Sequence, residues 1–143
     1  MRNTSLVFVC LGLMGCGPEW NGTFVGTLSS TGFCSDGSSV PPSSDAVQVT
    51  LADNGDSVTW ESNCGATFIA DINDDDQANV RQTSCPATTN ADGVTTSFTV
   101  EDGTLTLNDN TLQMEINFFV TVSGTISATC SVSSDGTLKR LEE

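Results

Sequence analysis

The stretch TLQMEINFFVTVS, residues 111–123, alternates apolar and polar side chains almost without a break. Its apolar phase consists of Leu112, Met114, Ile116, Phe118, Val120 and Val122. Only Phe119 falls out of step. A period of two over this length is typical of a β-strand with one buried face and one wet face. The rest of the chain must therefore provide a sheet that buries the apolar face of this strand.

Shorter versions of the same signal recur along the whole chain. Clusters of Gly, Ser, Thr, Asn and Asp separate brief apolar alternations, with no amphipathic helix, repeat or second domain. The predicted strands are residues 20–30, 46–52, 57–62, 67–72, 77–83, 94–101, 104–108, 111–122 and 125–132, and 136–141 is a candidate for one more. This pattern predicts an all-β fold, an antiparallel meander of about eight to ten strands, for which a small up-and-down barrel is favoured over a β-sandwich.

Turn signals between these segments set the expected hairpin registers. Turns at Asn54-Gly55, Asp102-Gly103 and Asp109-Asn110, and a three-residue loop after Val122, all pair apolar residues with one another. The expected pairs are Leu51 with Val58, Val49 with Trp60, Val100 with Leu105, Phe98 with Leu107, Leu107 with Leu112, Leu105 with Met114, Val122 with Ile126 and Val120 with Ala128. Because a one-residue slip would expose every apolar side chain, this agreement supports consecutive hairpins. Segment 31–45 is expected to be a long loop, since Pro41-Pro42 cannot join a central strand.

The first seventeen residues, MRNTSLVFVCLGLMGCG, have the character of a leader. The apolar run from Leu6 to Met14 follows Arg2 and is shorter than the roughly 20 residues that a spanning helix needs, so a secretory signal is predicted. Leu13-Met14-Gly15-Cys16 resembles the lipobox of bacterial lipoproteins. The resemblance implies cleavage before Cys16, a diacylglycerol on its thiol and acylation of the new amino group. Two or more acyl chains give stable membrane anchoring.

The expected organisation is a signal peptide at residues 1–15, a lipidated tether at 16–19 and a single β domain at 20–143. Gly17, the second mature residue, is not an Asp-type retention signal. For a Gram-negative host, the resemblance to other lipoproteins then implies an exported protein anchored to the outer membrane.

Charge restricts the partners of the domain. The four Lys and Arg residues include Arg2 of the leader, which leaves three against 18 Asp and Glu, a formal charge of −15. Nucleic acid is excluded as a partner because binding it depends on basic side chains that neutralise phosphates. Anionic lipid surfaces would repel the domain, so its expected membrane contact is the lipid on Cys16. A cationic protein partner remains open, beside the alternative that the charge only maintains solubility.

Four cysteines remain once Cys10 leaves with the leader and Cys16 is lipidated: Cys34, Cys64, Cys85 and Cys130. An exported domain with four cysteines predicts two disulfides, and the absence of close Cys pairs and of His argues against zinc. Folding 67–72 onto 77–83 places residue 65 roughly opposite residue 85, which favours a Cys64–Cys85 bridge. Cys34 and Cys130 then pair by elimination.

Residue composition argues against catalysis. The chain has no His and no Tyr, so no catalytic residue is assigned, no cofactor is expected and a non-catalytic binding or interaction role is predicted. Two alternatives stay open, a calcium-dependent surface protein and a lipoprotein that resembles periplasmic enzyme inhibitors in size, charge and location.

Two local features are candidate contact sites. In DINDDDQ, residues 71–77, Asp71, Asn73 and Asp75 match the first ligands of a calcium loop, although Asp76 stands where that loop needs Gly. The competing interpretation is a hairpin turn kept soluble by its charge. Phe119 should lie on the wet face of its strand, where it would either contact a partner or be covered by a neighbouring loop.

Overall fold

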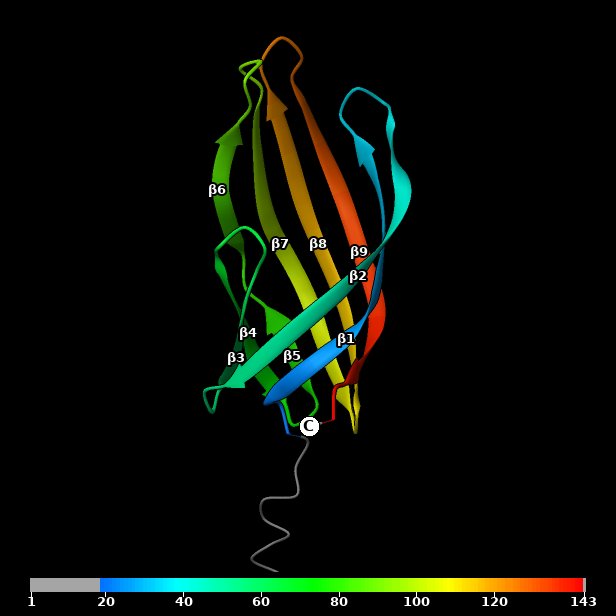
Figure 1. The fold of residues 1–143 in the computed structure, drawn as a ribbon, viewed down its shortest axis with the longest axis vertical. Coiled ribbons are helices and arrows are strands. Elements are labelled where there is room, and N and C mark those ends of the chain that lie inside the picture. The colour runs from blue at the N-terminus through cyan, green and yellow to red at the C-terminus, as the bar shows by residue number, and fades with distance from the viewer. Residues whose placement is uncertain (1–18, 143) are drawn as a thin grey trace, which may run out of the picture.

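The computed structural model describes residues 19–142, and these residues form strands and turns only. The strands are β1 (Gly22–Cys34), β2 (Ser39–Asp53), β3 (Ser57–Glu61), β4 (Thr67–Asp74), β5 (Gln77–Val80), β6 (Thr83–Thr89), β7 (Thr95–Asn108), β8 (Thr111–Ser123) and β9 (Ala128–Arg140). Figure 1 shows them as one tall sheet that curves around a common axis. Within residues 19–142, no helix is long and apolar enough to cross a membrane.

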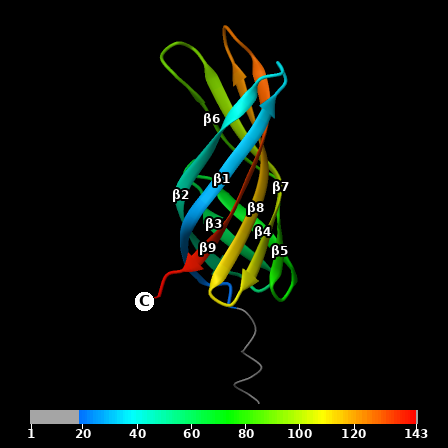
Figure 2. The ribbon, with the colours of Figure 1, turned by 90° about the vertical axis from the view of Figure 1, so that its right-hand side faces the viewer.

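All nine strands belong to one antiparallel sheet that closes on itself (Figure 1, Figure 2). The order is β5-β4-β3-β2-β1-β9-β8-β7-β6, and β5 also pairs with β7, which completes the ring. β5 and β6 follow one another along the same edge of β7, with Ala78 opposite Leu105 and Cys85 opposite Phe98. The expected all-β meander of consecutive hairpins is confirmed, and it closes as an up-and-down barrel requires.

Inward-facing side chains fill one half of this ring, the half where β1 begins and β9 ends, which is the lower half in Figure 1. The β7–β8 hairpin has the expected register, with Leu107 opposite Leu112 and Leu105 opposite Met114. The largest fully buried side chains are Phe24, Leu105, Leu107, Leu112, Met114, Leu138, Val58 and Val100. They come from strands around the ring, so a single sheet surrounds its own hydrophobic core.

The expected turn at Asp102-Gly103 is wrong, and with it the pairs Val100–Leu105 and Phe98–Leu107. β7 runs unbroken past this point along β8, with a register shift between Val100 and Asp102. A Cβ at position 103 would lie 2.7 Å from the Glu115 carbonyl oxygen and 3.1 Å from Val80 Cγ2. Gly103 is therefore explained by the close approach of the neighbouring strands, not by a change of chain direction.

Segment 31–45 is not the long loop that the sequence suggested. β1 continues to Cys34, a tight turn follows, and β2 begins at Ser39. Pro41-Pro42 lies where the β1–β2 register shifts, between the pairs Ser30–Ser43 and Gly32–Val40. β3 pairs with β2 only at Ala52 and Asp53, so the prolines occupy a stretch of β2 with a free edge. Edges and bulges are the places in a sheet where the missing proline N–H is tolerated.

In two further hairpins the strand register is shifted by two residues from the expected one. The chain turns at Gly55-Asp56, since Asn54 N–H donates to the Ser57 carbonyl at 2.8 Å, and Asp53 lies opposite Val58. Val122 and Val120 face Ala128 and Cys130 across a longer loop, and Ile126 in that loop is exposed. The expected pairs Leu51–Val58, Val49–Trp60, Val122–Ile126 and Val120–Ala128 are therefore wrong. The two segments expected at 125–132 and 136–141 form one strand, β9. A shift of two residues keeps each side chain on its face, which is why the apolar pattern did not reveal it.

Both predicted disulfides are present. Cys64–Cys85 joins Cα atoms 5.8 Å apart, and the β4–β5 register that predicted it is confirmed by Ala70 opposite Val80. Cys34 and Cys130 are direct cross-strand neighbours on β1 and β9 and form the second bridge.

We expect Leu138→Ala to lower the free energy of unfolding by about 2–5 kcal/mol, because Leu138 is fully buried and its removal leaves a cavity. Leu141→Ala is the matched control, since Leu141 lies just after β9 and is 52% exposed; its cost should stay within about 0.5 kcal/mol. Urea unfolding of the oxidised protein measures both. Equal losses in the two variants would contradict this position of the core.

Candidate functional site

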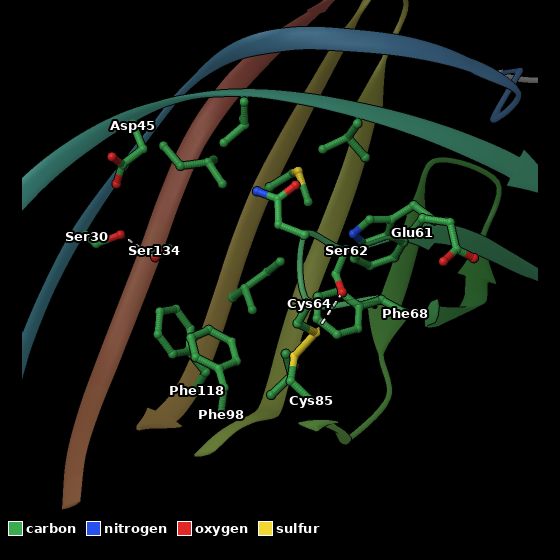
Figure 3. A pocket seen from close by; sticks show the side chains of 18 of the residues that line it. Ser30, Asp45, Glu61, Ser62, Cys64, Phe68, Cys85, Phe98, Phe118 and Ser134 are labelled. Carbon is green, nitrogen blue, oxygen red and sulfur yellow. Dashed lines mark hydrogen bonds between the residues drawn. A yellow bond between two sulfur atoms is a disulfide. The ribbon is translucent and has the colours of Figure 1, made fainter. Parts of the chain in front are cut away.

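Above the packed core, the interior of the ring opens into a cavity of about 650 Å³ (Figure 3). Its wall comes from β1 to β4, the β3–β4 loop and β6 to β9. This volume lies within the usual range of small-molecule sites, about 300–1,000 Å³. The cavity is the candidate functional site.

The cavity exists because inward-facing residues become small on one side of the ring. Near the lower end β1 and β9 contribute Phe24 and Leu138, whereas higher up the wall has Ser30 and Ser134. The two serine hydroxyls form a hydrogen bond of 2.5 Å across these strands. Between these levels β9 has Gly136, where a Cβ would clash with the Thr27 carbonyl oxygen. The inner surface of β1 and β9 therefore recedes and leaves space.

Aromatic side chains form the opposite walls. Phe98 and Phe118 stack with ring centroids 4.3 Å apart, and both are only partly buried. Trp60 and Phe68 meet edge to face at 5.6 Å. Figure 3 shows Phe68 on a different side of the hollow from Phe98 and Phe118. The stacked pair thus presents aromatic surface to the cavity itself.

The cavity opens between β2 and β6. β2 pairs with β3 only at Ala52 and Asp53, and β6 pairs only with β7, so the upper parts of β2 and β6 have no strand between them (Figure 1). The β3–β4 loop covers the lower part of this gap. The Cys64–Cys85 disulfide ties the loop to β6, and Ser62 Oγ donates to the Ala66 carbonyl at 2.8 Å. This disulfide therefore shapes the lower lip of the opening.

The charged residues that line the cavity are both acidic. Asp45 belongs to the inward-facing set of β2 and lies opposite Leu28 on β1. Its Oδ2 accepts a hydrogen bond from Ser43 Oγ at 3.3 Å. Glu61, at the end of β3, accepts a hydrogen bond from Thr67 Oγ1 at 2.5 Å. The mouth therefore has negative charge above a largely apolar interior.

The residues of the expected calcium loop lie outside this cavity. Asp71 is paired with Arg81, whose Nε donates at 2.8 Å to Asp71 Oδ2 and whose Nη2 lies 2.5 Å from Oδ1. The Asp75 backbone carbonyl accepts from Trp20 Nε1 at 3.1 Å, and Asn73 Nδ2 lies 3.5 Å from Gln77 Oε1. Across residues 19–142, no group of three His, Cys, Asp or Glu side chains could hold a metal ion.

The hydrogen bonds from Arg81 lower the pKa of Asp71, and the same contact raises the pKa of Arg81. Both side chains are about half exposed, so the pair adds little to stability. Its contribution is present above the unfolded-state pKa of Asp71 and is lost as the pH falls through the lower folded-state pKa.

Phe119 lies on the outer face of β8, between Thr99 of β7 and Ser131 of β9. It is half-buried. On the far side of Ser131, β1 places Phe33, which is 76% exposed. The remaining predicted site residue, Cys16, lies outside the described residues.

Sequence reasoning missed the cavity. The available signal was the run of small residues at alternate positions of the last strand, Ser134 and Gly136, where a core strand would have larger apolar ones. These small residues indicate a cavity only once it is known that Ser30 of β1 lies opposite Ser134.

Comparison with protein-family models, curated proteins and solved structures finds no match to this chain. The function must therefore be argued from the geometry.

We expect Arg81→Gln to raise the pKa of Asp71 toward its ordinary value, because the guanidinium that stabilises the carboxylate is removed. Arg140→Gln should leave this pKa unchanged, since Arg140 contacts the carbonyl oxygens of Glu19 and Asn21 instead. Titration of the side-chain carboxyl carbons by NMR measures both. An unchanged Asp71 titration in Arg81→Gln would show that the pair does not persist in solution.

Proposed function

We propose that this protein is an exported, lipid-anchored, non-catalytic binding protein whose ligand is a small apolar molecule held in the cavity. The observation behind the proposal is the hollow of about 650 Å³ with aromatic walls and one lateral opening. A closed sheet with a fully packed interior offers no such volume. This one leaves apolar surface accessible to a guest.

The lining favours apolar ligands. The stacked Phe98–Phe118 pair and the neighbouring Ile116 and Met114 line the cavity from β7 and β8. A ligand that covers such surface gains about 25 cal/mol for each Å² removed from water. The Ser30–Ser134 hydroxyls use one another as partners, so this wall demands little from a ligand.

Binding is a better explanation of the cavity than catalysis. The chain has no His, the side chain that most often acts as general acid or base, and no Tyr. Asp45 and Glu61 come from different strands, and each is hydrogen-bonded to its own neighbour, Ser43 or Thr67. Nothing in this arrangement pairs two carboxylates across a reacting bond.

The position of the cavity is compatible with an anchor on Cys16. Arg140 and Trp20 hold the first described residues at the closed end of the ring, where Trp20 Nε1 donates to the Asp75 carbonyl at 3.1 Å. The residues that line the cavity include Ser30 on β1 and Ser134 on β9, which lie farther from this end than Phe24 and Leu138. A lipid on Cys16, three residues before Glu19, would hold the closed end at the membrane and leave the mouth accessible to the aqueous phase.

We expect the mature chain without its lipid, residues 17–143, to bind N-phenylnaphthylamine, a neutral apolar fluorophore, in a saturable manner. Leu28→Trp should weaken this binding at least about tenfold, because the larger side chain fills the cavity. Thr27→Trp is the matched control, since Thr27 is exposed and does not line the cavity. Fluorescence titration measures all three proteins. Absence of saturable binding, or an equal effect of the two variants, would refute the proposed function.

We expect Cys16→Ser to abolish incorporation of labelled palmitate into the full chain in its bacterial host, because the thiol that receives the lipid is lost. Cys10→Ser, which changes a cysteine inside the predicted leader, should retain the label. Equal labelling of both variants would contradict the anchor.

A further inference from the structure

We infer that the ligand is a cationic amphiphile, with its apolar chain in the cavity and its positive headgroup at Asp45. This inference rests on the proposed function and specifies the ligand class for the same cavity. It is carried by the position of Asp45 and by the distribution of charge along the ring.

Asp45 lies where the apolar part of the inward face of β2 ends, at an exposed position between Ser43 and Val47. The inward-facing residues that follow it on this strand are Val47, Val49 and Leu51, and the last two are buried. Its cross-strand neighbour on β1 is Leu28, which also lines the cavity. Asp45 therefore places a carboxylate at the rim of the cavity, beside the apolar side chains that line it. Figure 3 shows Asp45 beside the hollow, near the Ser30–Ser134 pair.

The Asp45 carboxylate has spare hydrogen-bonding capacity. Ser43 Oγ, at 3.3 Å, supplies its one side-chain hydrogen bond among the described residues. An ionised carboxylate offers about four lone-pair sites. An ammonium headgroup, with up to three N–H donors, matches an acceptor of this kind.

Basic residues lie away from the mouth. Arg81 is bound to Asp71 on the outer face. Lys139 and Arg140 end β9 at the closed end of the ring, where the Arg140 guanidinium lies 4.6 Å from the centroid of the Phe24 ring. None of the three lines the cavity.

The loops and walls of the open half contribute acids instead, among them Asp36 in the β1–β2 turn and Asp92 in the β6–β7 loop. Hydrogen bonds from Ser38 lower the pKa of Asp36, so this group stays ionised. Together with the strongly negative chain, they create a potential that attracts cations to the mouth and repels anions. A fatty carboxylate would therefore meet repulsion, and among residues 19–142 no basic side chain lines the cavity to neutralise it.

The test is displacement of bound N-phenylnaphthylamine by three compounds with the same alkyl chain: dodecylammonium, dodecanol and dodecanoate, each below its micellar concentration. Dodecylammonium should displace the probe at a concentration at least about tenfold lower than dodecanoate, with dodecanol between them. Raising the salt to 1 M, where the screening length falls to about 3 Å, should reduce this preference.

Asp45→Asn should reduce the preference for dodecylammonium over dodecanoate at least about threefold, because the carboxylate that receives the headgroup is removed. Asp135→Asn is the matched control, since it removes the same charge from the exposed outer side of β9 and should keep the preference. Equal displacement by all three compounds, or the same preference in Asp45→Asn as in the unmodified protein, would overturn the cationic assignment and leave the proposed function intact. Failure of the probe itself to bind would refute the proposed function and this inference with it.

Discussion

Pairing between β1 and β9 is the interaction on which the rest of the structure depends. It joins the two ends of the chain over a long ladder, from Phe24 opposite Arg140 to Cys34 opposite Cys130. Without it the meander would be an open sheet with an uncovered apolar face and two free edges. Once the ring is closed, each strand needs only one apolar face, because the sheet itself covers the core. This is why a chain without helices can bury side chains such as Leu105 and Leu112 completely.

Unequal strand lengths divide the interior of this ring into two parts. β1, β2, β7, β8 and β9 are long, whereas β3 and β5 have only 5 and 4 residues. The short strands surround the lower half, where Val58 and Ala78 are fully buried. Above them no strand joins β2 to β6, and the cavity opens to the outside. The short β3–β4 hairpin is therefore the element that separates core from cavity, and its length determines how far the opening extends.

Local patterns in the sequence predict the parts of this fold that local interactions determine. The alternation in β8 and the tight turn at Asp109-Asn110 identify a hairpin with the correct pairs, and the β4–β5 register identifies the Cys64–Cys85 bridge. Asp102-Gly103 has the composition of a turn, but Gly103 serves a close contact with strands that the sequence does not show to be neighbours.

The cavity could not be predicted in the same way, because its wall depends on residues far apart in the chain. Ser30 and Ser134 are separated by 104 positions and meet only when the ring closes. The opening depends on which strand is missing from one side, a property that no single segment encodes. The charge of the chain was evident from composition, whereas the position of Asp45 beside the cavity depends on the β1–β2 register.

The hollow half of the ring has fewer fully buried side chains than the packed half, and both disulfides lie at its walls. Cys34–Cys130 links β1 and β9 beyond the level of Ser30 and Ser134, at the last pair of the β1–β9 ladder. It closes a chain segment of 96 residues, for which the chain-entropy model gives about 4–5 kcal/mol of stabilisation. Cys64–Cys85 fixes the lip of the opening against β6, a strand paired on one side only. The two disulfides hold β1 to β9 and the β3–β4 loop to β6 without filling the cavity. In a small domain with a binding cavity, the walls must be held by links such as disulfides, because side chains that stabilised the walls by packing would also occupy the site.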